Sequence, residues 1–334
     1  YELEFGKQVK RAGTASPIAK ASEEGIALPG ASIDRMGRLH IRGNVCETSV
    51  IDITDRDARP RKEAEITLES NGPVRAVVKT VSTLSNEDGS ASFTIEKRIE
   101  AWRGVPFVRV HHTFLNSLAP TFTNIDELSY VVANVEPNWD ALRVDGSAVS
   151  LTATRSVQQH FDSEFVHHKQ KTKGRLNGSI ISTTDSGLAI AVRDFWQNYP
   201  KSFSVTSKAL VIGLCPDFEP GLYDSFPFER EGHQLYYYLR DGHYRFKSGM
   251  AKTHEMLIGA GNRQEREAMC TLFQRPLIAT APPEWYCESE ALYDIAPRNP
   301  KKFKLYEEGI DYNLERYKLR REQQHDYGLM NYGD

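Results

Sequence analysis

The sequence predicts a mainly β protein: a large antiparallel β-sandwich followed by the start of an α-helical domain. Three observations lead to this prediction. Between residues 64 and 260, more than ten segments show the apolar and polar alternation of half-buried strands. Turn signals such as Asp88-Gly89 separate these segments about every 10 to 20 residues. After Gly261 the alternation gives way to apolar residues at helical spacing.

The first 60 residues are predicted to form an N-terminal β-rich segment. Residues 37–45, "GRLHIRGNV", predict a short strand. Residues 52–62, "DITDRDARPRK", are typical of a charged connector. The boundary of the segment is therefore expected near residue 60.

Residues 61–275 are predicted to form the central β-sandwich domain. Several strands run for about 9 to 11 residues against a usual 5 to 6, which favours two large packed sheets over a small barrel. In residues 106–116, the alternation puts Val108, Val110 and Phe114 on one face together with His112. In chain order, the predicted strands and hairpins lie at 65–70, 74–84, 92–102, 106–116, 125–135, 141–151, 178–185, 187–196, 202–216, 233–249 and 251–261.

The C-terminal part changes character. Residues 262–275 predict a helix of about three turns that Pro276 ends. Residues 276–334 are predicted to be a Pro-rich linker and the first helix of a truncated α-domain, with Pro300 near the helix start. We therefore expect this chain to be part of a longer protein. The apolar residues at helical spacing are Leu305, Ile310, Leu314 and Leu319.

Composition excludes several classes of protein. The net charge is −3 and the sequence pI is about 6.4, so no basic field suits a nucleic acid. No apolar run is long enough to cross a membrane. The sequence does not decide whether the four cysteines are free thiols or form disulfides. A secreted or periplasmic location is expected, with a cytoplasmic one as the alternative. The cysteines, none of them in a C-x-x-C motif, are Cys46, Cys215, Cys270 and Cys287.

The first of three clusters that could carry chemistry is "RDFWQNYPK", residues 193–201. In a functional interpretation, Trp196 or Tyr199 offers a ring to a sugar, and Gln197 and Asn198 bind its hydroxyl groups. Lys201 then meets a carboxylate. In a structural interpretation, Trp196 lies at the edge of the core and residues 199–201 form a turn. Spacing alone favours the structural interpretation.

The second cluster is "YYYLRDGHYRFKSG", residues 236–249, which predicts a hairpin turning at Asp241-Gly242. It offers His243, Tyr244 and Arg245 as catalytic residues for elimination at a uronate. An arginine neutralises the carboxylate, a His or Tyr removes the C5 proton, and another acid protonates the leaving oxygen. An exposed hairpin with paired tyrosines is the equally weighted alternative.

The third cluster is "MAKTHEMLIG", residues 250–259, where Lys252 and His254 share one strand face with Met256. A single His on such a face is more often structural than ligand-binding. The "VHH" at 166–168 is expected in a polar loop. No P-loop, hydrolase elbow, dinucleotide fingerprint or zinc-protease motif is present in the sequence.

The order of several segments resembles the exo-rhamnogalacturonan lyase-like family, of polysaccharide lyase family 26 type, which includes bacterial YetA-like proteins. The segments run from "PVRAVVKT" and "SFTIEKRIEAWRGVPFVRVHHTFLN" through "GLAIAVRDFWQNYPKSFSV" and "ALVIGLCP" to "FKSGMAKTHEMLIG" and "YGLMNYGD". The resemblance covers most of residues 60–334. It implies a super-sandwich followed by an (α/α) toroid, of which this chain would hold only the opening helix.

The resemblance also implies a function: β-elimination on rhamnogalacturonan, a pectin backbone, or a related uronate-containing glycan. The expected partner is an acidic polysaccharide or oligosaccharide, with no nucleic acid and no membrane. No cofactor is fixed, and a divalent cation such as Ca²⁺ stays open. Two alternatives are a non-catalytic carbohydrate-binding or structural module and a glycoside hydrolase accessory domain using Asp194, Glu229 or Glu255. The predicted substrate-binding residues are Trp196, Gln197, Tyr199, Lys201, Lys252, His254, Asn331 and Tyr332.

Overall fold

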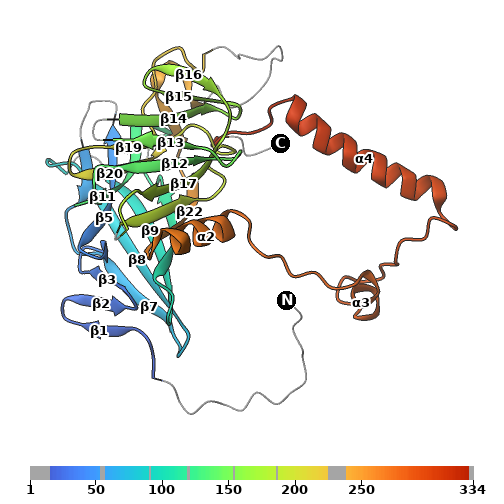
Figure 1. Ribbon diagram of the computed structural model, residues 1–334, viewed down its shortest axis with the longest axis horizontal. Coiled ribbons are helices and arrows are strands. Elements are labelled where there is room, and N and C mark those ends of the chain that lie inside the picture. The colour runs from blue at the N-terminus through green and yellow to red at the C-terminus, as the bar shows by residue number, and fades with distance from the viewer. Residues whose placement is uncertain are drawn as a thin grey trace.

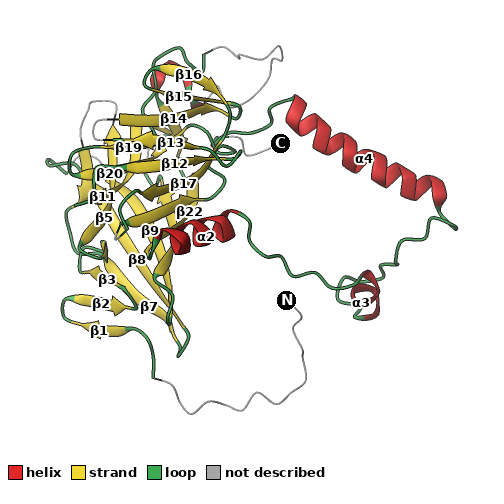
Figure 2. Cartoon of the chain, viewed as in Figure 1, coloured by secondary structure: helices red, strands yellow, loops and turns green. Residues whose placement is uncertain are grey.

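The computed structural model describes residues 16–52, 57–89, 92–118, 121–152, 155–185, 187–224 and 238–330. These residues form 22 strands, one short 3-10 helix and three α-helices. Every strand pairing among them is antiparallel. Strands make up the body of the molecule, and the α-helices come at its C-terminal end (Figure 2). The mainly β, antiparallel prediction is confirmed.

Strand pairing divides the molecule into two sheets. In the first sheet, β21 (Tyr244–Lys247) joins the row beside one end of β11. The row itself runs β1 (Lys20–Ser22), β2 (Gly25–Leu28), β3 (Ala31–Asp34), β4 (Leu39–Ile41), β5 (Asn44–Asp52), β11 (Phe122–Ala133), β20 (Ala209–Cys215), β19 (Lys201–Val205), β14 (Arg155–Phe161), β15 (Glu164–His167) and β16 (Gln170–Lys173).

The second sheet is joined to the first by β6 (Asp57–Pro60), which pairs with β5 in one sheet and with β8 in the other. This link makes one continuous hydrogen-bonded system of all 22 strands in the described residues. The second sheet runs β7 (Glu65–Asn71), β8 (Arg75–Ser85), β9 (Ser92–Trp102), β10 (Phe107–Leu115), β22 (Ala251–Ala260), β18 (Leu188–Val192), β17 (Leu176–Ser182), β12 (Trp139–Arg143) and β13 (Ala148–Leu151).

The two sheets pack face to face, as side-chain contacts between them show. The Phe114 ring on β10 lies 4.9 Å from the Phe246 ring on β21. The Thr48 hydroxyl on β5 lies 2.8 Å from Nε2 of His112 on β10. The predicted inward face of β10 is buried, because the alternating side chains of a strand fall on opposite faces of the sheet. The prediction of two packed sheets is therefore confirmed.

Helix α2 (Arg263–Gln274) covers the outer face of the second sheet (Figure 1). Asn262 caps its N-terminus and forms a capping box with Glu265, which satisfies otherwise unpaired backbone donors. Cys270 and Phe273 of the helix pack against outward apolar residues of the sheet. These sheet residues are Phe107, Ile181, Ala189, Ala191 and Leu257.

The chain then forms an arm that projects away from the sandwich (Figure 1). The arm contains α3 (Pro283–Glu288) and α4 (Lys304–Gln323), and neither helix has a buried residue. The chain returns to the sandwich beyond α4, where Tyr327 and Leu329 are buried. Helix α4 confirms a C-terminal helix, although it begins four residues after Pro300. None of the α-helices in the described residues is both long and apolar enough to cross a membrane.

Two local predictions were wrong. The Asp241-Gly242 turn does not close a hairpin: it lies in the 3-10 helix η1 (Arg240–Gly242), and β21 pairs with β11. Residues 225–237, including most of the predicted first hairpin arm, lie outside the described residues. The predicted polar loop around residues 166–168 instead forms the β15–β16 hairpin, which turns at His168-Lys169. The sequence there lacks the Asn-Gly or Asp-Gly signal on which hairpin predictions depend.

Candidate functional site

A cavity of about 560 Å³ lies beside Trp196, and we call it the Trp196 cavity. Three parts of the fold form it: the β12–β13 hairpin with the adjoining β17, the loop after β18, and α2. Its lining is rich in arginines and amides around one indole ring, a composition that can hold a polar ligand through specific contacts. The lining residues are Leu142, Arg143, Val144, Gly146, Ala148, Asn177, Asp194, Trp196, Gln197, Arg263, Glu267, Thr271, Gln274 and Arg275.

The loop of residues 193–200 positions Trp196 and Gln197 at the cavity. Asp194 has a positive φ of 51°, and its carbonyl accepts hydrogen bonds from the backbone and side chain of Asn198. This compact turn sends Phe195 into the core, where its ring stacks on Phe203 at 4.7 Å. The side chains of Asp194, Trp196 and Gln197 line the cavity instead. The loop therefore both anchors the core and lines the cavity.

The Trp196 indole is braced by two other side chains. The guanidinium carbon of Arg175 lies 3.8 Å from the centre of the indole ring, within the range of a cation–π contact. The Tyr327 ring meets the indole edge-on at 4.8 Å. The side chain is half-buried, so these contacts fix the orientation in which it reaches the cavity.

The arginines of the cavity differ in their ion pairs. Arg263 is paired with Glu267 at 2.8 Å and with Asp140 at 3.2 Å. Arg143 is paired with Asp145 at 3.0 Å. The cavity's third arginine, Arg275, is exposed and forms no ion pair with any described residue. It is therefore the cation of this cavity that is best placed to meet a ligand carboxylate.

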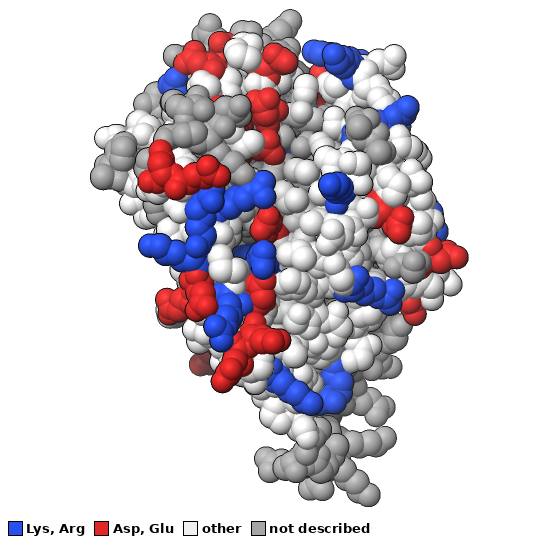
Figure 3. All heavy atoms as spheres, turned by 90° about the vertical axis from the view of Figure 1, so that its left-hand side faces the viewer, with Lys and Arg blue, Asp and Glu red and all other residues white. Residues whose placement is uncertain are grey.

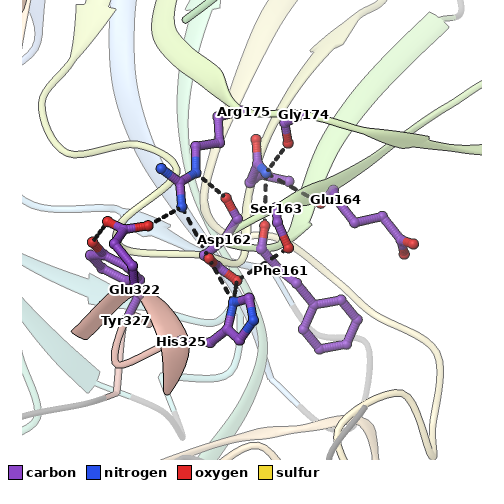
Figure 4. Close-up of polar contacts among 10 residues, drawn as sticks. Phe161, Asp162, Ser163, Glu164, Gly174, Arg175, Glu322, His325 and Tyr327 are labelled. Atoms are coloured by element: carbon purple, nitrogen blue, oxygen red, sulfur yellow. Dashed lines mark hydrogen bonds and ion pairs between the residues drawn. The ribbon is translucent and has the colours of Figure 1, made fainter. Parts of the chain in front are cut away.

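The C-terminal segment docks beside this cavity through a network centred on the buried carboxylate of Asp162 (Figure 4). His325 Nδ1 lies 2.9 Å from Asp162 Oδ1, and Arg175 donates to both Asp162 and Glu322. The Tyr327 hydroxyl donates to Glu322, which lowers the pKa of this carboxyl together with the Arg175 contact. Arg175 thus connects the docked segment to the Trp196 indole.

Tyr199 and Lys201, predicted to bind substrate, lie in the core. The Tyr199 ring is fully buried, 5.9 Å from Phe161. The Lys201 ammonium donates to the Leu214 carbonyl at 2.6 Å, and burial lowers the pKa of this lysine to about 7. Neither side chain lines the Trp196 cavity. Their ligand contacts stay predictions, and burial of both side chains argues against them.

Lys252 and His254, on β22, also face inward. The Lys252 ammonium donates to Asn198 Oδ1 at 3.0 Å, so it supports the loop that carries Trp196. Burial lowers its pKa. His254 is almost fully buried opposite His112, with ring centres 6.5 Å apart. Burial lowers the pKa of His254 well below its usual value. The predicted shared face is confirmed, while the substrate contacts stay predictions.

The three predicted catalytic residues do not converge on one point. Tyr244 points into the core, where its hydroxyl donates to the Pro216 carbonyl at 2.6 Å and burial raises its pKa well above the usual value. His243 and Arg245 lie on the opposite face of the strand, because neighbouring residues alternate. His243 Nδ1 is hydrogen-bonded to Asp126, and Arg245 is ion-paired with Asp241. The catalytic roles of all three stay predictions.

Other predicted groups are placed as follows. Asn331 and Tyr332, and also Glu229, lie outside the described residues. Glu255 is ion-paired with two arginines, and Asp194 lines the Trp196 cavity. Within the part of the chain that the structure describes, no three His, Cys, Asp or Glu side chains gather as metal ligands. A Ca²⁺ requirement stays a prediction.

All four cysteines are free thiols, three of them buried. On the face drawn in Figure 3, basic and acidic side chains lie next to one another along one band, and the charged side chains beside the band are scattered among uncharged residues. That face therefore carries no extended basic field.

Sequence reasoning missed the residues that the second sheet and α2 contribute to the cavity. Asn177 lies on β17, which begins two residues before the predicted strand 178–185, and Arg263 and Arg275 fall in the predicted helix 262–275. Nothing in their spacing shows that these segments meet the 193–200 loop. The only local signal is the density of arginine in and next to α2. Exposed arginines are common on helices, so this signal does not identify a site.

Comparisons with known proteins show distant structural similarity. No protein-family model matches the sequence, and no curated protein does. The chain is similar to an α-mannosidase from Enterococcus faecalis V583, with a TM-score of 0.44, 13% identity and coverage of 76% of this chain and 31% of that one. The match to the GH36 α-galactosidase AgaA from Geobacillus stearothermophilus has a TM-score of 0.37 and 10% identity, and covers 65% of this chain and 30% of that one. The match to a putative aldose 1-epimerase from Klebsiella pneumoniae has a TM-score of 0.38 and 7% identity, and covers 74% of this chain and 81% of that one.

The chain therefore spans about a third of the length of the two glycosidases. These are distant structural similarities, and they assign no family. The resemblance to the exo-rhamnogalacturonan lyase-like family stays a prediction.

Proposed function

We propose that this chain is the sandwich portion of a carbohydrate-active protein and binds an acidic saccharide in the Trp196 cavity. The observation that carries the proposal is that Trp196 and Gln197 share one cavity with Arg275, an arginine without an ion pair among the residues that the structure describes. An indole gives an apolar face to a sugar ring, and amides bind hydroxyl groups. An arginine holds a carboxylate in a bidentate pair. A uronate-containing glycan presents all three of these chemical features.

Binding can be measured by isothermal titration with a short oligogalacturonate and with a neutral galactan oligosaccharide. We expect Arg275→Gln to weaken oligogalacturonate binding about 10- to 150-fold, because a charge-assisted hydrogen bond contributes about 1.5–3 kcal/mol. Neutral-ligand binding should stay unchanged in this variant. Trp196→Ala should weaken binding of both ligands, since both need the ring.

The matched control is Arg61→Gln, which removes another partly exposed arginine at the start of the loop before β7. It should leave both affinities unchanged. Equal affinity of the wild type and Arg275→Gln for oligogalacturonate would contradict the assignment of Arg275. Binding that survives Trp196→Ala with a native melting temperature would place the saccharide elsewhere.

β-Elimination is the finer activity that we propose as a second candidate. The observation that favours it is the His243–Asp126 hydrogen bond on the outer face of β21, because a carboxylate that orients a partly exposed imidazole supports a general base. Arg245 lies on the same face, where it could neutralise a uronate carboxylate. Tyr244 has no part in this candidate, because it points into the core.

Elimination forms an unsaturated uronate that absorbs ultraviolet light. The assay therefore follows ultraviolet absorbance while the wild-type protein is incubated with rhamnogalacturonan or with polygalacturonate. The expected result is a rise in absorbance that His243→Gln reduces at least 100-fold, the usual size of a general-base contribution being about 10²–10⁴. Saccharide binding without any rise in absorbance would reject elimination by this chain and retain the binding function.

A further inference from the structure

The β15–β16 hairpin carries a run of cations at the edge of the first sheet. Lys169 lies in its turn, and Lys171 and Lys173 follow on β16. All three are exposed, and among residues 164–173 only Glu164 has a carboxylate, 3.6 Å from the Lys171 ammonium. We call these three lysines the basic edge. It concentrates positive charge in a chain whose net charge is −3.

Positive groups at the hairpin crowd one another. On β14, the guanidinium Nη1 of Arg155 lies 2.7 Å from Nε2 of His168 in the hairpin turn. The pKa of the adjacent His167 is lowered by burial and then by His168 and Arg155. Arg155 therefore adds a further cation beside the three lysines, and this local positive charge favours the approach of an external anion.

The turn itself is conformationally costly for its sequence. His168 and Lys169 have φ values of 51° and 62°, the left-handed conformation that two-residue hairpin turns require at both positions. Asn and Gly adopt this conformation at lower energy. A His-Lys pair at these positions therefore places a lysine at the tip of the hairpin at a conformational cost.

The basic edge leads to the Trp196 cavity. Arg143, which lines that cavity, donates to the Lys173 carbonyl at 3.4 Å, and its guanidinium lies 5.4 Å from the Phe165 ring on β15. Two residues after Lys173, Arg175 stacks on Trp196. Hairpin and cavity are therefore joined through direct contacts.

We propose that the basic edge is an extended subsite that holds the anionic groups of an acidic polysaccharide whose terminal or internal units occupy the Trp196 cavity. This inference rests on the proposed function and adds to it a dependence on chain length. A single-stranded nucleic acid fits the edge less well, because residues 164–173 contain no Trp or Tyr on which bases could stack, and their one Phe, Phe165, is buried. Lysines on an edge strand also block unwanted strand pairing, a structural role that needs no ligand.

The test compares the wild type with the double variant Lys169→Gln/Lys171→Gln, titrated with a short oligogalacturonate and with long polygalacturonate at low and high salt. We expect polymer affinity at low salt to fall about three- to tenfold, from two exposed ion pairs, and short-ligand affinity to stay unchanged. The dependence of polymer affinity on salt should also become shallower. The matched control, Lys302→Gln/Lys304→Gln, removes two exposed lysines from the arm, one of them ion-paired, and should change neither affinity.

Each outcome decides between the explanations. Unchanged polymer affinity in the double variant would overturn the inference and leave edge protection as the role of these lysines. Equal weakening of short and long ligands would place the lysines in the primary site, which also overturns it. Tighter binding of single-stranded oligothymidylate than of polygalacturonate would assign the edge to nucleic acid. If short-ligand binding is absent and Trp196→Ala has no effect, the proposed function fails, whatever the double variant does to the polymer.

Discussion

Arg266→Ala is expected to lower the free energy of unfolding by about 3–5 kcal/mol, the range for loss of a large buried side chain with charge-assisted hydrogen bonds. Arg266 is fully buried between α2 and the second sheet. Its guanidinium donates to the carbonyls of Ser182, Leu188 and Thr184 at 3.0, 3.2 and 2.6 Å. The variant removes the guanidinium donors from those carbonyls, of which Thr184 keeps the Gly187 N–H at 3.2 Å, and it creates a cavity beneath the helix.

Urea denaturation followed by circular dichroism measures this loss. Arg263→Ala is the matched control, because Arg263 lies on the same helix but makes only partly exposed ion pairs, worth up to about 1 kcal/mol each. The affinity of Arg266→Ala for oligogalacturonate should also fall, since α2 forms one wall of the Trp196 cavity. A loss of stability no larger than that of Arg263→Ala would show that α2 docks mainly through Cys270 and Phe273.

His254→Leu is expected to make the protein more resistant to acid. Burial lowers the pKa of His254 well below 6.5 and that of His112 to about 3. Since both pKa values are lower in the folded protein than in the unfolded chain, the unfolded chain binds more protons below pH 6.5, and stability falls as the pH falls. Each such group contributes about 1.4 kcal/mol per pH unit between the two pKa values.

The measurement is the free energy of unfolding at several pH values between about 6.5 and 4. His254→Leu should reduce the pH slope by about 1.4 kcal/mol per pH unit and leave the contribution of His112 in place. The imidazole of His254 can be replaced by an apolar group because neither ring nitrogen meets a hydrogen-bond partner in the described part of the protein. Met256→Leu, at the next inward position of β22, is the control and should keep the wild-type slope. An unaltered slope in His254→Leu would mean that His254 is solvated in the folded state.

The strands were largely predictable because alternation of apolar and polar residues has a direct physical cause in the geometry of a sheet. Residues 74–84, 92–102 and 106–116 became β8, β9 and β10, and the Asp145-Gly146 turn joins β12 to β13 as its sequence indicates. Where the turn signal and the real partner disagreed, as at Asp241-Gly242, the prediction failed. A turn dipeptide describes local backbone preference, while strand pairing depends on the whole sheet.

The candidate site was harder to predict than the fold. Trp196 and Gln197 were identified by residue type, but Lys201, identified in the same way, was expected to meet a ligand carboxylate, and buried lysines are rare. Only the packed structure shows that its ammonium is held by backbone carbonyls in the core. The opposite face of the cavity comes from α2, some 70 residues further along the chain, by the count from Trp196 to Glu267. Contacts between such distant segments leave no signal in local spacing.

Arg175 couples docking of the C-terminal segment thermodynamically to the position of the Trp196 indole. The same guanidinium neutralises Asp162 and Glu322, which hold the returning C-terminal segment, and stacks on the indole that lines the cavity. If undocking of the segment releases Arg175, the indole loses its support at the same moment. Linkage is reciprocal, so a saccharide that binds more tightly when Arg175 supports the indole also stabilises the docked C-terminal segment. A force that pulls the arm away from the sandwich would then weaken saccharide binding.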